Sequence, residues 1–198
     1  MKQLVEHIMA CINQEYALEK SEQEIIQFGI EAALEVGANV FISILILYKM
    51  DMMLEGLIFF STFIPIRTLA GGYHSESYLC CLLFSACTLM GVMILSSHIN
   101  ISKELIMILI LILELVIGMI GPIINSDRPV SQKEYIVFSK KLYKIFVIDA
   151  VLCVCIGATG YDELLNIVFL SLCLIVATLV IGKIKYKEYQ IKFRERNH

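Results

Sequence analysis

Charged residues are scarce in this sequence of 198 residues, of which 18% are charged and 58% are hydrophobic. The mean hydropathy is +0.77. Soluble globular domains carry roughly 25% charged and 45–50% apolar residues. The scarcity of charge therefore excludes a soluble globular domain and indicates an integral membrane protein.

The sequence also lacks the residue spacings that indicate a disulfide framework or a metal site. Its seven cysteines do not fall into paired spacings, and its four histidines are scattered along the chain. We therefore expect neither structural disulfides nor bound zinc, and no cofactor. Five of the cysteines are expected to be small buried apolar residues, namely Cys11, Cys87, Cys153, Cys155 and Cys173.

The first twenty residues lack a basic start followed by an uninterrupted apolar core, so they do not resemble a signal peptide. Residues 1–20 instead carry apolar side chains at helical spacing, among them Leu4, Ile8 and Ile12. This pattern predicts an amphipathic helix that lies in the membrane interface. The alternative is an ordinary amphipathic helix packed on the protein.

Six apolar runs follow, and they predict an all-α polytopic membrane protein in which residues 22–182 form a transmembrane bundle. A capping-box pattern at Ser21 and Glu24 puts the start of the first long helix near residue 22. The second run contains Glu55 and Pro65 and could form a re-entrant hairpin instead of a full crossing. The runs cover residues 29–48, 53–69, 78–97, 105–124, 145–160 and 164–182.

Basic residues gather on one side of this predicted topology, which treats residues 1–198 as a single membrane domain. If all six runs cross, one side carries the N-terminal segment, the loop after the second run, a polar loop at 126–144 and a basic tail at 183–198. That side holds all 16 Lys and Arg residues except Lys49 and Lys103. By the positive-inside tendency it is cytoplasmic, and both termini are expected there.

Residues 67–81 concentrate the reactive side chains of the chain. Gly71 and Gly72 let the backbone bend at little steric cost. His74 follows them and precedes a pair of adjacent cysteines. A histidine near a cysteine is the minimum arrangement for a thiolate nucleophile with a general base.

Helical spacing favours Cys81 over Cys80 as the partner of His74. On a continuous helix Cys81 would return to the face of His74, whereas Cys80 would sit roughly 100° away. Two helical turns also correspond to roughly 10 Å, which is too far for a direct hydrogen bond. We therefore expect His74 on a loop that turns back toward the start of the helix.

This stretch resembles the accessory gene regulator B (AgrB) family of membrane proteases in Gram-positive quorum sensing. The family pattern is an arginine, two glycines, a histidine and a cysteine at set spacings. Here it is met by Arg67, Gly71, Gly72, His74 and Cys81. A second and weaker match covers Gly121 to Pro129. The hydrophobic layout is similar to the family along nearly the whole chain.

The resemblance implies a membrane-embedded cysteine endopeptidase that processes a short precursor (AgrD-like) peptide into a cyclic signal. It also implies that the protein works in the lipid bilayer of the cell membrane and forms a homodimer. No nucleic-acid partner is expected. In the implied chemistry, transfer to a cysteine or serine within the substrate closes a thiolactone or lactone ring.

The expected catalytic roles follow from side-chain chemistry. Cys81 would attack a peptide carbonyl as a thiolate after His74 takes its proton, which gives a thioester acyl-enzyme. Arg67, beside Gly71 and Gly72, would stabilise a developing oxyanion or hold a substrate carboxylate. The alternative for Arg67 is a cytoplasmic anchor at the end of a span.

Other charged residues are weaker candidates. Asp149 is expected at the depth of Cys81, where it would orient His74 or receive substrate, or make a structural polar contact between spans. Glu31 and Glu35 either lie in the headgroup zone or receive a basic part of the substrate. Lys140 and Lys141 could attract an acidic precursor tail, although a solvated cytoplasmic loop explains them as well.

Two other classes of function fit the composition. A small transporter or channel would line a polar pathway with Glu31, Glu35, Glu114 and Asp149. No internal repeat is visible to support it. A purely structural subunit of a signalling complex is the third option. Both alternatives predict that Cys81 can be replaced with little loss, unlike the protease.

Overall fold

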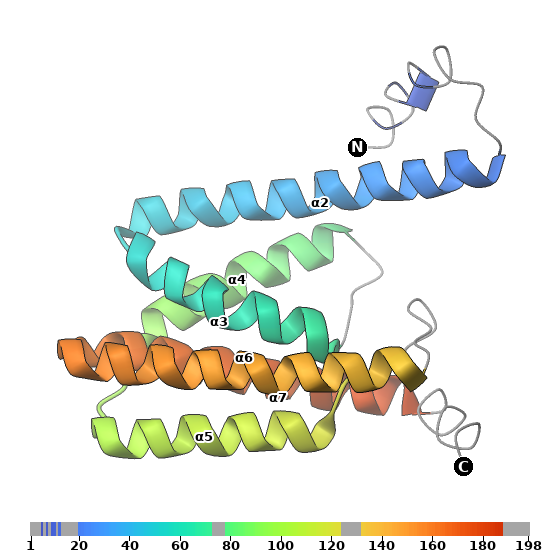
Figure 1. The fold of residues 1–198 in the computed structure, drawn as a ribbon. Coiled ribbons are helices and arrows are strands. Elements are labelled where there is room, and N and C mark those ends of the chain that lie inside the picture. Colours follow the sequence, from blue (N-terminus) through green and yellow to red (C-terminus); the bar gives the residue numbers. More distant parts are fainter. Residues whose placement is uncertain are drawn as a thin grey trace.

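The computed structural model describes residues 20–72, 78–123 and 132–187, together with Val5, His7, Met9, Ala10 and Ile12. These parts of the chain form long helices without a strand, which confirms the predicted all-α fold. Figure 1 shows α2 along one side, α5 along the opposite side, and the other helices between them. The helices are α2 (Lys20–Met50), α3 (Met53–Ala70), α4 (Tyr78–Ser96), α5 (Lys103–Ile120), α6 (Gln132–Thr159) and α7 (Asp162–Lys185).

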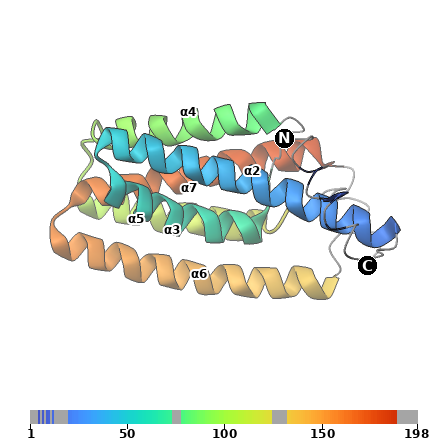
Figure 2. The ribbon, with the colours of Figure 1, turned by 90° about the horizontal axis from the view of Figure 1, so that it is seen from above.

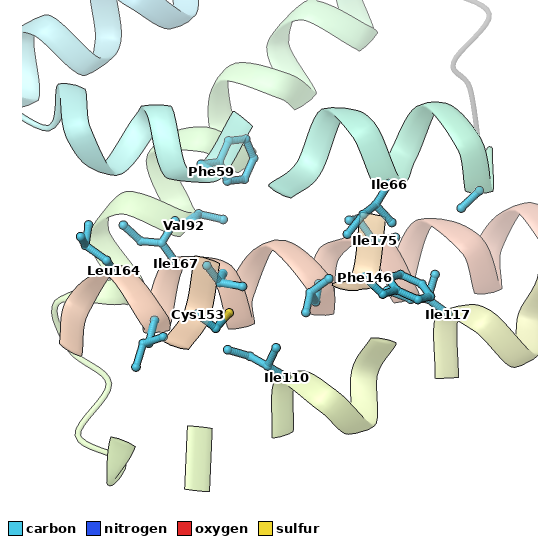
Figure 3. Close-up of a cluster of buried hydrophobic side chains, with 14 of the residues drawn as sticks. Phe59, Ile66, Val92, Ile110, Ile117, Phe146, Cys153, Leu164, Ile167 and Ile175 are labelled. Carbon is cyan, nitrogen blue, oxygen red and sulfur yellow. The ribbon is translucent and has the colours of Figure 1, made fainter. Parts of the chain in front are cut away.

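Helix α7 is the central element of the bundle. It packs against α3, α4, α5 and α6, and the two ribbon views agree on this position. Figure 2 also shows the helices running side by side. Its apolar residues are buried along most of its length, and several are fully buried, including Leu165, Ile167, Leu172, Ile175 and Leu179. The core that these residues form with α3, α5 and α6 is drawn in Figure 3.

The long helix α2 lies at the edge of the bundle and packs against α3 and α4. Its 31 residues span about 46 Å, which exceeds the roughly 30 Å hydrocarbon core of a bilayer. Only Gly29–Met50 is apolar enough to cross. The observed helix start at Lys20 is close to the start predicted near residue 22.

A tight turn joins α2 to α3. Asp51 adopts a positive φ of 57° there, and the N–H of Met52 donates to the carbonyl of Leu47 at 3.0 Å. A Cβ atom on Gly56 would lie 2.1 Å from Cδ1 of Leu47. Glycine at position 56 therefore lets the first turns of α3 approach the last turns of α2.

Helix α3 is continuous from Met53 to Ala70. A re-entrant hairpin over residues 53–69 is therefore wrong, although Pro65 lies inside the helix. Its 18 residues correspond to about 27 Å, close to the thickness of the hydrocarbon core.

Within the described ranges, five helices are long and apolar enough to cross a membrane, namely all except α5. Helix α5 has 18 residues but includes Lys103, Glu104 and Glu114. Its Lys103 Nζ donates to the carbonyl of Gly157 near the end of α6, at 2.9 Å. The set of helices fits a multi-pass membrane protein.

The outer faces of the bundle are apolar. Phe41, Met119 and Val147 have exposed fractions of 63%, 78% and 65%. Apolar surface of this extent is characteristic of a lipid-facing protein. It also explains why Cys87 and Cys155 are exposed rather than buried as predicted. A small apolar side chain can face lipid as readily as it can face the core.

The predicted polar loop over residues 126–144 is wrong from residue 132 onward, because α6 begins at Gln132. Lys and Glu are good helix formers, so a polar composition does not exclude a helix. Leu142 is buried within this segment, whereas Lys140 and Lys141 are exposed. The first turns of α6 are thus an amphipathic extension of the last-but-one span.

The predicted interfacial helix lies mostly outside the described residues. Val5 and Met9 are helical and buried, and His7 is helical and exposed. Its position in the membrane interface stays a prediction. The basic tail beyond Lys187 also lies outside the described residues.

Candidate active site at the ends of α3, α4 and α7

The glycine pair ends α3 and turns the chain. Gly71 and Gly72 have φ values of 71° and 127°, a region that residues with a Cβ rarely adopt. The N–H of Gly71 still donates to the carbonyl of Arg67 at 3.0 Å. The backbone bend expected at this pair from the sequence is therefore present.

Both glycines are also required by close packing. A Cβ on Gly71 would lie 3.0 Å from the carbonyl oxygen of Ile123. A Cβ on Gly72 would lie 2.2 Å from Nη1 of Arg67 and 3.2 Å from the carbonyl oxygen of Thr178. A larger residue at position 72 would displace the Arg67 guanidinium, and one at position 71 would press against the backbone of Ile123.

The side chain of Arg67 folds back onto this turn. Its Nη1 donates to the carbonyl oxygen of Gly71, and the residue is only partly exposed. The guanidinium also lies close enough to Cys81 and Tyr186 to interact with them electrostatically. Arg67, in the last turn of α3, therefore lies near the start of α4 and the end of α7.

The second sequence match meets the first one in space. The N–H of Ile123 donates to the carbonyl of Ala70 at 2.8 Å. Gly121 ends α5 with a φ of 71°, and a Cβ there would lie 2.6 Å from the hydroxyl oxygen of Tyr135. The turn after α5 is thus held between the end of α3 and the start of α6. Residues 124–131 lie outside the described part of the chain.

The cysteine pair lies at the start of α4, which begins at Tyr78. Cys80 is exposed and Cys81 is partly buried. Cys81 is therefore the cysteine turned toward the bundle and toward Arg67. His74 lies outside the described residues, so its predicted approach to Cys81 stays a prediction.

Asp149 lies beside Glu114, and this corrects the depth predicted for it. Asp149 Oδ1 accepts a hydrogen bond of 2.8 Å from Thr62 Oγ1, near the middle of α3. Its carboxyl group also interacts with that of Glu114, near the middle of α5. The predicted depth of Asp149, level with Cys81, is wrong because α6 begins at Gln132, well before residue 145. The structural polar contact between spans, named above as an alternative, is present.

The four acids of the transporter alternative lie in separate parts of the bundle. Glu31 and Glu35 are on α2, which packs against α3 and α4. Glu31 accepts a hydrogen bond of 3.1 Å from Gln27 on the same helix. Glu114 and Asp149 are buried on α5 and α6. This arrangement does not resemble a single polar pathway.

Tyr186 is a residue of this region that the sequence analysis missed. It is 6% exposed, although its neighbours Lys185 and Lys187 are exposed. The signal was present in the helical spacing, because Tyr186 continues the buried face that includes Leu179 and Gly182. Because residues 183–198 are rich in Lys and Arg, they were predicted to be a polar tail, and the buried position of Tyr186 was not predicted.

Comparison with known proteins identifies the family. A sequence profile of the family described as Accessory gene regulator B matches residues 5–180. The chain belongs to the accessory gene regulator B family.

A protein described as AgrB-like, from Lactiplantibacillus plantarum, is 29% identical to the chain over 131 residues. The match covers 66% of the chain and 66% of that relative. No solved structure matches the chain.

Proposed function

We propose that the chain is a membrane-embedded cysteine endopeptidase that cleaves a precursor peptide and releases it as a cyclic thiolactone or lactone. The observation that carries this proposal is the position of Arg67, in the last turn of α3, near the partly buried Cys81 at the start of α4. Membership of the accessory gene regulator B family supports it.

In the proposed reaction, His74 takes the proton from Cys81 Sγ, and the thiolate attacks a peptide carbonyl carbon. The peptide C–N bond then breaks, the leaving amine takes a proton from His74, and a thioester remains on Cys81. A cysteine or serine side chain of the same peptide next attacks that carbonyl. His74, neutral again, takes the proton of that attacking group. The Cys81 thiolate then leaves, and the ring closes through a thioester or an ester.

Arg67 supplies the positive charge for this chemistry. Its guanidinium would face negative charge on Cys81 and on the tetrahedral intermediate. The hydrogen bond from Nη1 to the carbonyl of Gly71 supports a fixed side-chain position. Gly71 and Gly72 would contribute by allowing this close approach, which a Cβ would obstruct.

Substrate contacts beyond the reacting atoms are proposed for two pairs of charged residues. Lys140 and Lys141 are exposed on the first turns of α6 and would attract an acidic part of the precursor. Glu31 and Glu35, partly buried on α2, would receive a basic part. For Asp149, orientation of His74 is the less favoured role, because its carboxyl group contacts Thr62 and Glu114.

The proposed orientation puts the candidate site and both termini on the cytoplasmic side. Arg67, Lys183 and Lys185 lie in the last turns of α3 and α7, which end on the same side of the bundle. Lys103 lies at the opposite end, against the last turns of α6. This distribution agrees with the positive-inside tendency. A homodimer is proposed from the resemblance to the family, and the mass of the protein in lipid nanodiscs would test it.

The test is co-expression with the precursor peptide, followed by mass spectrometry of the peptide and of the protein. Cys81→Ala and His74→Ala should abolish the cleaved precursor and the acyl-enzyme. Cys80→Ala is the matched control, because the neighbouring thiol is exposed, and it should process normally. Unchanged processing by Cys81→Ala would disprove the assignment.

A further inference from the structure

Two carboxyl groups are buried together in the middle of the bundle. Glu114 on α5 is 5% exposed and Asp149 on α6 is 3% exposed. Each lies near the centre of a helix that crosses the bundle. Ionisable side chains at this depth are costly and usually serve a purpose.

The hydrogen bonds of this pair are incomplete. Thr62 is fully buried, and its hydroxyl donates to Asp149 Oδ1 at 2.8 Å. Glu114 Oε1 and Asp149 Oδ2 are both buried and have no hydrogen-bond donor among the described residues. The two carboxyl groups nevertheless lie within hydrogen-bonding reach of each other. Ionised carboxylates only accept hydrogen bonds, so a bond between them requires a proton on one of them.

The described residues around the pair offer no compensating positive charge. Figure 3 shows Ile110, Ile117, Phe146 and Cys153 in the apolar core between α5, α6 and α7. The sequence of each helix around the pair supplies no Lys, Arg or His at its level. The nearest basic residues along the four helices are Arg67 on α3, Lys103 on α5, Lys144 on α6 and Lys183 on α7.

The titratable groups that face the pair are few. Helix α6 adds Cys153, one turn beyond Asp149 and close enough to interact with both acids. Helix α3 has no titratable side chain between the charged residues of its first and last turns. Helix α7 has only Cys173 between its charged end turns. No cluster of three potential metal-ligating side chains occurs in the described parts of the chain. A proton is therefore a better candidate occupant than a divalent metal ion.

We infer that Glu114 and Asp149 form a proton-binding site that holds at least one proton between their two carboxyl groups. The proton comes from water and returns to water, and no covalent bond of the protein changes. With the proton bound, one carboxyl donates to the other, and Thr62 satisfies the remaining oxygen of Asp149. This inference does not rest on the proposed peptidase activity.

The site also links three helices. Thr62 anchors α3 to α6, and Glu114 brings in α5. Thr62 lies five residues before Arg67 on the same continuous helix. Loss of the proton would leave two like charges in contact, with the Thr62 hydroxyl as the one side-chain donor described for them, and this disfavours the packed arrangement. The protonated form should therefore hold α3, and with it Arg67, in place.

Infrared spectroscopy tests the proton directly. The protein would carry Cys81→Ala, so that the result is independent of the peptidase proposal, and would be measured in lipid nanodiscs at neutral pH. We expect a C=O stretching band of a protonated carboxyl that shifts in D2O. The band should be absent from the E114Q/D149N variant. The matched control, E31Q/E35Q, removes two acids from α2 and should keep the band.

Two results would overturn the inference. One is the absence of a protonated-carboxyl band at neutral pH in the Cys81→Ala protein that retains both Glu114 and Asp149. The other is a band that survives in E114Q/D149N. A second variant, Thr62→Val, keeps the shape of the side chain and removes only its donor. It should retain the band and shift its frequency, because Asp149 Oδ1 loses a hydrogen bond. An unchanged frequency would contradict a proton shared with the carboxyl group that Thr62 contacts.

Discussion

The N–H of Ile123 donates to the carbonyl of Ala70 at 2.8 Å, so the turn after α5 is joined to the end of α3. Each residue lies next to a glycine with a positive φ or two positions from one, namely Gly71 and Gly121. Two short matches to the family, distant in sequence, therefore form one structural unit. The second match is weak when considered alone. Its backbone contact with the first match shows that it helps to hold the end of α3 in place.

Replacement of Gly71 by alanine should weaken this unit. With a φ of 71° and a ψ of −143°, the backbone of position 71 disfavours a Cβ by roughly 1–3 kcal/mol. The added atom would also approach the carbonyl oxygen of Ile123 to 3.0 Å. We expect a lower melting temperature in detergent and a loss of peptide processing. Gly91→Ala is the control, because a Cβ there meets nothing within 4 Å. Equal melting temperatures for the two variants would contradict the packing described here.

Gly72→Ala should act mainly on Arg67. The new Cβ would lie 2.2 Å from Arg67 Nη1, so the guanidinium must move. If Arg67 supports the reaction, the processing rate should fall by at least as much as in Arg67→Gln. The double variant Gly72→Ala/Arg67→Gln should process peptide no more slowly than Arg67→Gln alone, because the guanidinium that the new Cβ would displace is absent. Additive losses would show that Gly72 acts through another contact, such as the carbonyl of Thr178.

Arg67→Gln should slow the reaction of Cys81 with iodoacetamide. The guanidinium interacts electrostatically with Cys81, and a nearby positive charge favours the reactive thiolate form of a cysteine in general. The measurement needs a background in which the exposed Cys80, Cys87 and Cys155 are serine or alanine. Arg67→Lys, which keeps the charge, is the control and should react faster than Arg67→Gln. Equal iodoacetamide reaction rates for the parent protein, Arg67→Gln and Arg67→Lys would show that Arg67 does not influence Cys81.

The helices were largely predictable because hydrophobicity decides which segments can cross a bilayer. Four runs match α3, α4, α5 and α7 within a few residues, and α2 begins near its predicted start. The start of α6 was not predictable in this way, because Gln132 to Lys144 is polar yet helical. Hydropathy reports where a chain can be buried in lipid, and it does not report where a helix begins.

The chemistry of single positions was predictable, but their contacts were not. The glycine pair indicated a bend, and its positive φ values agree. The contact between Asp149 and Glu114 depends on the relative depth of α5 and α6, which no local pattern encodes. Tyr186 was assigned to a polar tail by composition, whereas packing against the bundle buries it.

Tyr186→Ala should destabilise the protein by about 3–5 kcal/mol, the usual cost of removing a buried aromatic side chain. Tyr186→Phe keeps the ring and removes only the hydroxyl. We expect it to melt near the wild type but to process peptide more slowly, because the Tyr186 phenol interacts with Arg67. Tyr48→Ala, at a site that is 75% exposed, is the control for aromatic removal. Normal processing by Tyr186→Phe would limit Tyr186 to a packing role.

Gly56→Ala should strain the joint between α2 and α3. Its Cβ would lie 2.1 Å from Cδ1 and 2.6 Å from Cδ2 of Leu47, which is only 3% exposed. Overpacking of this kind costs roughly 1–3 kcal/mol, and Leu47→Ala alone should cost about 2–5 kcal/mol by leaving a cavity. The new methyl group would occupy part of that cavity, so the double variant should be more stable than the sum of the single losses predicts. Melting temperatures of the four proteins in detergent would measure this coupling, and strict additivity would show that α2 and α3 do not pack through this pair.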